Sequence, residues 1–136
     1  MRARKFGLSA LLLLVLAFGA HAATWVVTQT NIAFVPNDIT IEVGDTVEWH
    51  WTNFSHTVTS GVDLNDPNAG LLFDAPLDAA HTIFSFTFTE AGDQPYFCRP
   101  HVLMGMTGIV RVQGPTAVPE DSLEEPASLS AVKNLY

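Results

Sequence analysis

The chain contains a single cysteine, and the segment that follows it supplies three kinds of metal ligand. Cys98 is followed by His101 at the third position, and by Met104 and Met106 at the sixth and eighth. Thiolate, imidazole and thioether are ligands that soft or borderline metals prefer. We therefore expect the segment 96–106 to be a metal-binding loop, around which the rest of the chain must fold.

A copper site of the trigonal type needs one Cys, two His and a weak axial Met, so a second histidine must come from elsewhere. His56 follows a predicted strand over 47–52 and is the best-placed candidate. His50 falls on the polar side of that strand beside Glu48, and we expect it at the surface. His81 stands at the outer end of another predicted strand and is expected to be solvent-exposed. The residue types alone therefore favour His56.

The first 22 residues have the pattern of a secretory signal peptide. Basic residues precede an apolar run over 8–18, and Ala20-His21-Ala22 is a small-x-small cleavage site, which predicts cleavage after Ala22. A membrane anchor is the alternative, but the apolar run is too short to span comfortably. We expect an exported protein, periplasmic or otherwise, with no membrane insertion of the mature chain.

Removal of the signal peptide leaves an acidic chain. Three basic and fourteen acidic residues remain, which gives a formal charge of −11. This charge disfavours nucleic acid and anionic membrane surfaces as partners, and it favours a cationic partner or simply solubility. The lone Cys98 of an exported protein requires an explanation, and both a metal-bound thiolate and a buried inert thiol would provide one.

Short alternating segments separated by turn signals predict one all-β sandwich or barrel domain over residues 23–113. We expect residues 31–35 to continue the first strand after a bend. Residues 60–80 are predicted to be an irregular connection, held to the core by three apolar residues, Leu71, Leu72 and Phe73. The acidic, proline-containing segment 114–136 is predicted to be a disordered tail, with a partner-docking segment as the alternative.

The motif Cys98-x-x-His101-x-x-x-x-Met106 resembles the plastocyanin, amicyanin and pseudoazurin family of cupredoxins. His56 upstream, a Phe-rich strand and a Gly-Asp turn before the cysteine strengthen the resemblance, which covers residues 24 to 113. The resemblance implies a cupredoxin-like, eight-stranded Greek-key β-sandwich. It also implies one type 1 copper ion per chain, held by His56, Cys98, His101 and the axial Met106.

Two features of the resemblance are left open. Met104 has the spacing of the amicyanin axial ligand, whereas Met106 has that of plastocyanin and pseudoazurin, and the Met-Gly-Met exit favours Met106. Many members have Asn directly after the upstream His, where it ties the two ligand loops together, and here Thr57 takes that place. Asn53 is an alternative residue for fixing the loop. The reduction potential therefore stays open.

The resemblance implies a monomeric blue copper protein that carries single electrons, and not an enzyme, because neither His50 nor His81 has companions for a second centre. A periplasmic copper carrier with the same ligands is the alternative function, and zinc is the alternative metal. A c-type cytochrome or a copper or haem reductase is the expected redox partner. The apolar neighbours of His101 are expected to divide between the core and a docking patch; they are Pro100, Val102, Leu103 and Met104.

Overall fold

A computed structural model describes residues 21–115 of the chain. Within that range there are nine strands and one short 3₁₀ helix. The elements are β1 (Thr24–Thr30), β2 (Ala33–Val35), β3 (Asp38–Glu42), β4 (Thr46–His50), β5 (His56–Ser60), β6 (Asp74–Leu77), β7 (Ile83–Thr87), β8 (Gly92–Phe97), η1 (Arg99–Met104) and β9 (Thr107–Gln113). Most of the predicted signal peptide and tail lies outside the described residues.

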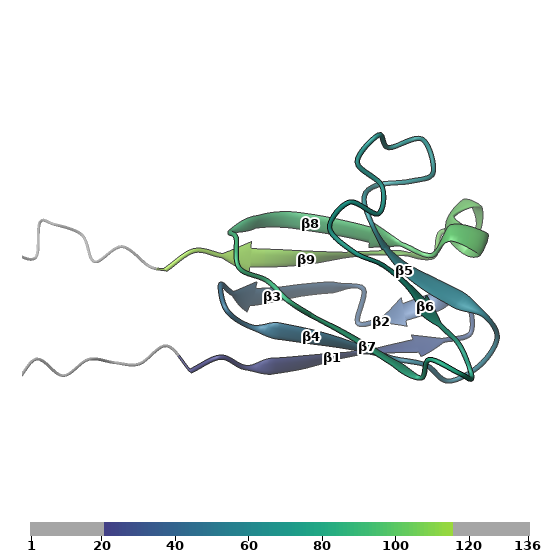
Figure 1. Ribbon diagram of the computed structural model, residues 1–136, viewed down its shortest axis with the longest axis horizontal. Helices are drawn as coiled ribbons and strands as arrows, with labels where there is room; N and C mark the ends of the chain where they lie inside the picture. The colour runs from purple at the N-terminus through teal and green to yellow at the C-terminus, as the bar shows by residue number, and fades with distance from the viewer. Residues whose placement is uncertain (1–20, 116–136) are drawn as a thin grey trace, which may run out of the picture.

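Two facing sheets form a sandwich, as Figure 1 shows. One sheet has the order β2-β1-β4-β7 and the other has the order β3-β9-β8-β5-β6. The β1–β4 and β3–β9 pairs are parallel, and the other strand pairs are antiparallel. The predicted all-β sandwich is therefore confirmed.

The structure of residues 21–115 has nine strands where the resemblance implied eight, and residues 31–35 do not continue the first strand as expected. Asn31 has φ 51°, a left-handed conformation that Asn tolerates better than most residues. The chain consequently turns back at this point, and β2 pairs antiparallel with β1, with Thr28 opposite Val35. What reads as one bent strand is thus a tight hairpin.

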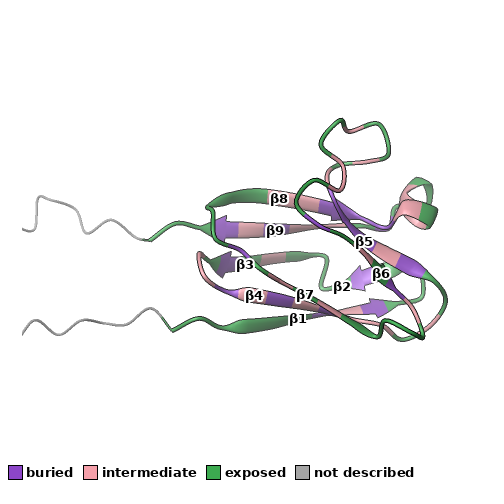
Figure 2. Cartoon of the chain, in the orientation of Figure 1, coloured by how far each residue is buried: buried purple, intermediate pink, exposed green. Residues whose placement is uncertain are grey.

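The core lies between the sheets and follows the alternation of the sequence (Figure 2). In β4, Val47 and Trp49 are fully buried, while Glu48 and His50 on the other face are partly exposed. The Trp49 ring lies 5.2 Å from the ring of Tyr96 on the opposite sheet. Burial of such aromatic rings stabilises the sandwich strongly, because each removes a large apolar area from water.

The 60–80 connection is more ordered than predicted, since it contains β6. This strand pairs with β5 and places Leu77 opposite His56. Phe73 is buried as expected, but Leu71 and Leu72 are 76% and 46% exposed, so the prediction for these two residues is wrong. The Ser60 hydroxyl accepts hydrogen bonds from the backbone N–H groups of Leu72 and Phe73. These bonds hold the backbone in place, and of the three apolar side chains only that of Phe73 is buried.

The loop expected to bind metal lies at one end of the sandwich, at η1. Both ends of the described chain lie at the opposite end (Figure 1). Among residues 21–115 the structure has no helix of the length and apolar character needed to cross a membrane.

Candidate metal centre

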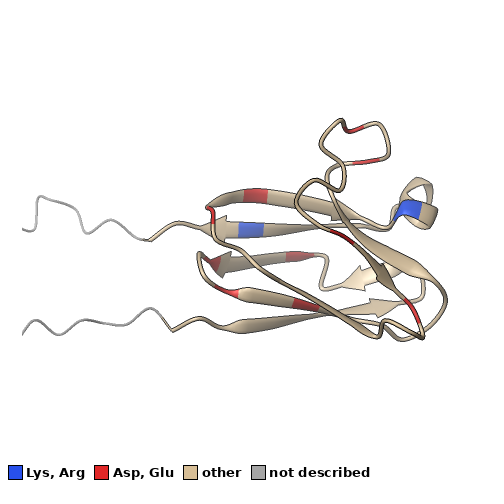
Figure 3. Cartoon of the chain, viewed as in Figure 1, with Lys and Arg blue, Asp and Glu red and all other residues tan. Residues whose placement is uncertain are grey.

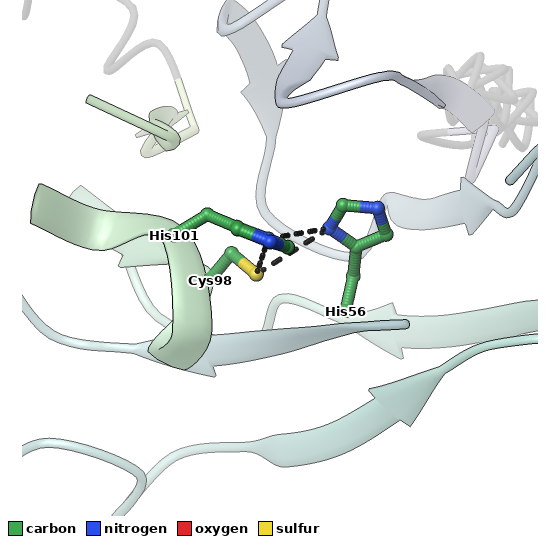
Figure 4. Close-up of side chains that lie close together, drawn as sticks. All are labelled: His56, Cys98 and His101. Carbon is green, nitrogen blue, oxygen red and sulfur yellow. Dashed lines mark hydrogen bonds between the residues drawn. The ribbon is translucent and has the colours of Figure 1, made fainter. Parts of the chain in front are cut away.

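Three of the predicted ligands converge at the η1 end of the sandwich. His56 is the first residue of β5, Cys98 directly follows β8, and His101 lies in η1. The Sγ atom of Cys98 lies 3.5 Å from Nδ1 of His56 and 3.4 Å from Nδ1 of His101. The two Nδ1 atoms are 3.1 Å apart. Figure 4 shows the three side chains directed toward one another.

The triangle formed by these atoms has the size that a metal ion requires. A point equidistant from the three atoms lies about 1.9 Å from each, whereas metal–nitrogen bonds are about 2.0 Å and metal–sulfur bonds about 2.3 Å, as for zinc. A metal ion would therefore reach normal bond lengths if it lay slightly out of the plane of the three atoms, or if the triangle widened slightly. No other group of three or more such ligands is found within residues 21–115.

His56 is held in one tautomer by the loop between β4 and β5. Its Nε2 lies 3.0 Å from the backbone oxygen of Asn53, and a carbonyl can only accept, so Nε2 carries the proton. The Nδ1 lone pair then faces Cys98. Burial lowers the pKa of His56, and the neighbouring charge of His101 lowers it further. The ring is therefore neutral and ready to donate to a metal at neutral pH.

Cys98 is a fully buried free thiol. Burial raises the pKa of this thiol, while hydrogen bonds from the Thr57 and His101 backbone act in the opposite direction. An inert core cysteine is surrounded by apolar side chains. Cys98 differs, because the Nδ1 atoms of two imidazoles lie within 3.5 Å of its sulfur. The centre thus has the donor set of a metal site and excludes bulk water from its sulfur.

The Cys98 loop is closed by backbone hydrogen bonds. Cys98 N–H donates to the Met106 oxygen at 3.0 Å, and Met106 N–H donates to the His101 oxygen at 3.2 Å. Gly105, with φ 83°, ends η1 and lets the chain turn back into β9. Met106 is 1% exposed, whereas Met104 is 58% exposed. Of the two methionines, only Met106 reaches the interior.

Thr57, which stands in place of the usual Asn, and Asn53, the alternative loop-fixing residue, both form hydrogen bonds at the centre. The Thr57 hydroxyl accepts a hydrogen bond from the Arg99 backbone at 2.9 Å and so ties β5 to the Cys98 loop. Asn53 holds His56 through its backbone oxygen. The Asn53 side chain in turn accepts from Gln29, a fully buried amide that also binds the backbone of Thr52. The role of Gln29 was not predicted.

The other two histidines of the folded domain have carboxylate partners. His50 Nε2 lies 2.9 Å from Glu48, as the sequence predicted. His81 Nδ1 lies 2.9 Å from Asp78, a partner that the sequence did not predict, although the spacing of three residues in a tight turn could have indicated it. Neither histidine belongs to the metal-binding cluster of the described residues.

Apolar residues flank the partly exposed His101 along η1. Leu103 is 94% exposed, Pro100 and Met104 are also exposed, and Val102 is half-buried. The expectation that some of these side chains pack into the core is therefore wrong, since none of them is buried. Phe54, in the loop between β4 and β5, is also 67% exposed, which the sequence did not predict.

Acidic residues dominate the charge of the described chain (Figure 3). Between 21 and 115 there are ten acidic residues against two basic ones, Arg99 and Arg111. Arg99 pairs with Asp74 at 2.7 Å, and Arg111 pairs with Asp38 and Asp93. Both positive charges are thus largely neutralised by neighbours.

A β-sandwich that gathers a thiolate and two imidazoles at one end defines a metal-binding domain of the cupredoxin class. The model of the copper binding proteins, plastocyanin/azurin family, matches residues 21–113. The chain belongs to this family, and copper is its cofactor.

Known relatives agree with this assignment. Plastocyanin from Scenedesmus fuscus is 34% identical over 86 residues, which cover 60% of this chain and 88% of the relative. Halocyanin from Natronomonas pharaonis is 36% identical over 88 residues, which cover 62% of this chain and about half (51%) of the relative.

Solved structures show the same fold. An oxidised amicyanin mutant aligns with a TM-score of 0.54 at 27% identity and covers 65% of this chain and 81% of its own. Oxidised plastocyanin from Dryopteris crassirhizoma aligns with a TM-score of 0.54 at 21% identity, over 65% of this chain and 99% of its own, and supports the fold alone.

Proposed function

We propose that this protein is an exported, monomeric electron carrier with one type 1 copper ion bound by His56, Cys98, His101 and Met106. The observation that carries the proposal is the triangle of His56 Nδ1, Cys98 Sγ and His101 Nδ1, with sides of 3.1 to 3.5 Å. A trigonal His₂Cys set with a weak axial thioether is the donor set used for electron transfer. Bound copper supplies the one-electron couple.

Burial and loop geometry support Met106 as the axial ligand. Its side chain is buried, and its backbone is hydrogen-bonded to both Cys98 and His101. Met104, at the end of η1, is exposed together with Leu103. The axial position of such sites is occupied by a long, weak bond, for which an interior thioether in the same loop is suited.

The contribution of the chain to electron transfer is rigidity. His56 and Cys98 are anchored by paired strands, and the ligands lie close together before any metal is present. Since the ligands need to move little between oxidation states, the reorganisation energy of the transfer is kept small. Burial of His56 and Cys98 excludes water, while the partly exposed His101 provides the exit for the electron.

The surface supports a transient complex with a cationic redox partner. Pro100, Leu103 and Met104, which lie in η1 with His101, are exposed apolar residues, and the chain that carries them is acidic. Charge steering of this kind accelerates association and makes it sensitive to salt. A c-type cytochrome or a copper or haem reductase has the required chemistry.

Residues 1–22 are proposed as the export signal, 23–113 as the copper domain and 114–136 as an acidic tail. The small-x-small sequence ending at Ala22 and the acidic composition after Gly114 support these boundaries. Export places the protein in a periplasm or outside the cell. We propose a carrier and not an enzyme, because the chain belongs to the plastocyanin/azurin family of copper binding proteins.

A visible absorption titration with Cu(II), followed by ascorbate, tests the function. We expect an intense band that saturates at one copper per chain, bleaches on reduction and returns on oxidation. His50→Gln is the matched control and should titrate identically, because His50 pairs with Glu48 outside the centre. A protein that stays colourless, or releases copper on reduction, would instead be a copper carrier without redox turnover.

A further inference from the structure

Four residues beside the metal centre form a closed ring of hydrogen bonds that begins and ends on Arg99. The Arg99 backbone N–H donates to Thr57 Oγ1 at 2.9 Å. Thr57 Oγ1 lies 2.9 Å from Thr59 Oγ1, which in turn lies 2.9 Å from Asp74 Oδ1. The Arg99 guanidinium closes the ring on Asp74, with Nη2 2.7 Å from Oδ2. The ring joins η1, β5 and β6.

The two ends of the threonine segment determine the direction of every bond in it. A backbone N–H can only donate and a carboxylate can only accept. The Thr57 hydroxyl therefore donates to Thr59, and the Thr59 hydroxyl donates to Asp74. The Arg99 side chain holds the pKa of Asp74 below its ordinary value, and the Thr59 hydroxyl acts in the same direction, so the acceptor stays ionised. Bonds aligned in this way strengthen one another, and the fully buried Thr59 has no exposure to water.

The ring touches the metal centre at two points. Thr57 directly follows His56, and Arg99 directly follows Cys98. We propose that Thr59 and Asp74 are positioning residues of the copper site, which act through Thr57 and Arg99 to fix the separation of the Cys98 loop from β5. This inference rests on the proposed function for its spectroscopic consequences, but the ring itself exists without metal.

Thr59→Val removes the central hydroxyl with little change of shape. The matched control is Thr87→Val, which removes one hydroxyl of the Thr46–Thr87 pair, 2.7 Å apart on the opposite sheet. In the metal-free protein we expect the Arg99 amide to exchange with solvent roughly two- to tenfold faster in Thr59→Val, the equivalent of about one net hydrogen bond. In the copper form of Thr59→Val the visible band and the reduction potential should shift. The Thr87→Val control should keep the wild-type exchange rate, band and potential.

A second pair of variants tests the carboxylate end. Asp74→Asn and Asp38→Asn each remove one negative charge from a bidentate arginine pair, but only Asp74 belongs to the ring. Asp74→Asn should shift the potential and the Arg99 exchange rate, whereas Asp38→Asn should leave both near wild type. Thr59→Ser should restore the values that Thr59→Val loses.

The outcomes separate the inference from the proposed function. Wild-type exchange rates, band and potential in both Thr59→Val and Asp74→Asn would overturn the positioning role, with the electron carrier intact. A wild-type protein with no intense band would refute the proposed function, and the Arg99 exchange comparison would still decide the positioning role.

A separate observation concerns Asp45, a carboxylate only 5% exposed between β3 and β4. It accepts hydrogen bonds from Ala23 N at 2.7 Å, Trp25 Nε1 at 2.9 Å and Glu42 N at 3.1 Å. These donors lower the pKa of Asp45, the Ala23 bond most strongly. Within residues 21–115 no basic side chain forms an ion pair with Asp45. A buried carboxylate without a cation is costly.

Ala23 is the residue that the proposed cleavage would make the new N-terminus. Hydrolysis of the Ala22–Ala23 peptide bond by a signal peptidase consumes one water, leaves a carboxylate on the leader and frees the Ala23 amine, which takes up a proton. We propose that this cleavage converts the Ala23–Asp45 hydrogen bond into an ion pair that fixes the start of β1. The backbone oxygen of Ala23 already accepts from Thr46 at 2.9 Å, so the residue is anchored on both sides.

The pH dependence of this ion pair has a defined sign. Among residues 21–115, the hollow lined by Ala23 holds three titratable groups, Asp45, Glu42 and His21, and His21 leaves with the leader. Both carboxylates favour the ammonium, so its pKa should lie above the ordinary α-amino value of about 7.7–8.0. The added stability is then present below that range and is lost as the pH rises through the raised pKa.

The experiment compares the mature chain beginning at Ala23 with the same chain acetylated on its α-nitrogen. Acetylation keeps an N–H donor but removes the charge. We expect a lower unfolding midpoint for the acetylated chain at a pH below 7 and equal midpoints well above the α-amino pKa. Asp45→Asn should abolish the difference at the lower pH. Equal midpoints at low pH, or an exported protein whose N-terminal sequence does not begin at Ala23, would overturn the proposal.

Discussion

The Nδ1 atom of His56 lies 3.5 Å from the Sγ atom of Cys98, although the two residues are 42 positions apart in the chain. Strand pairing produces this contact, because β5 and β8 are adjacent and antiparallel, with Thr59 opposite Phe97. His56, the first residue of β5, and Cys98, which directly follows β8, therefore meet at one end of the sandwich. The metal centre is a consequence of the sheet register.

Cys98→Ser should abolish the intense thiolate-to-copper band completely, because a hydroxyl cannot supply the covalent sulfur donor of a type 1 site. The visible spectrum of the copper-loaded variant measures this outcome. His81→Gln serves as the control, since His81 pairs with Asp78 and should leave the band unchanged. A Cys98 variant that remained blue would exclude the proposed ligand set.

Met106→Leu should leave a coloured site with a shifted reduction potential, because the side chain is nearly isosteric but its weak sulfur donor is lost. Met104→Leu should have the wild-type potential, since this side chain is 58% exposed at the end of η1. Protein-film voltammetry of both variants makes the comparison. The reverse pattern would assign the axial role to Met104.

Gly108→Ala should destabilise the fold by about 1–3 kcal/mol, the usual cost of overpacking a core. A Cβ at this position would clash with the ring of Tyr96, which packs directly over the glycine. Gly114→Ala is the control, because its Cβ would meet only Ala91 at 3.6 Å. Urea unfolding of the two variants measures the difference, and equal stabilities would contradict the described packing of Tyr96.

Copper affinity should rise with pH by about tenfold per unit for each proton that binding releases. Burial raises the pKa of the Cys98 thiol, so the metal-free protein keeps this proton at neutral pH and must release it to bind copper. Because the pKa of His56 is lowered, protons compete with copper for its ring nitrogen only in more acidic solutions. Competition with a chelator at several pH values gives the slope of log copper affinity against pH. In Cys98→Ser this slope should be smaller by one proton.

Deletion of residues 114–136 should leave the copper spectrum and the unfolding midpoint unchanged. The last strand of the domain, β9, ends at Gln113 and pairs with both β3 and β8. The spectrum and thermal unfolding of the truncated chain test this boundary. A lost site would show that the tail contributes to the domain.

The sequence predicted the fold class and the convergent ligands because both depend on strong, local patterns. The alternation along the predicted strand 47–52 put His50 on the polar side, and Val47 and Trp49 on the other side are buried. The unique Cys98 and its spacing to His101 left few choices for the loop. The selection of His56 over His50 followed from the period of one strand.

Other features were beyond the sequence because they depend on contacts between distant segments. Nothing local indicated that Asn31 would turn the chain into a hairpin, or that Leu71 and Leu72 would face solvent while Phe73 was buried. The Thr57–Thr59–Asp74–Arg99 ring likewise requires the register of β5 with β6. Tertiary context decides such positions, and local propensity does not.

Both ends of the described chain leave the sandwich opposite the metal centre (Figure 1). A tether at either terminus would therefore hold the protein with its redox-active end facing outward. Fusion to a second domain, or attachment to an electrode through an added terminal tag, should preserve access of partners to His101. Because the termini and the metal centre lie at opposite ends, attachment through a terminus would orient the copper site away from the supporting surface.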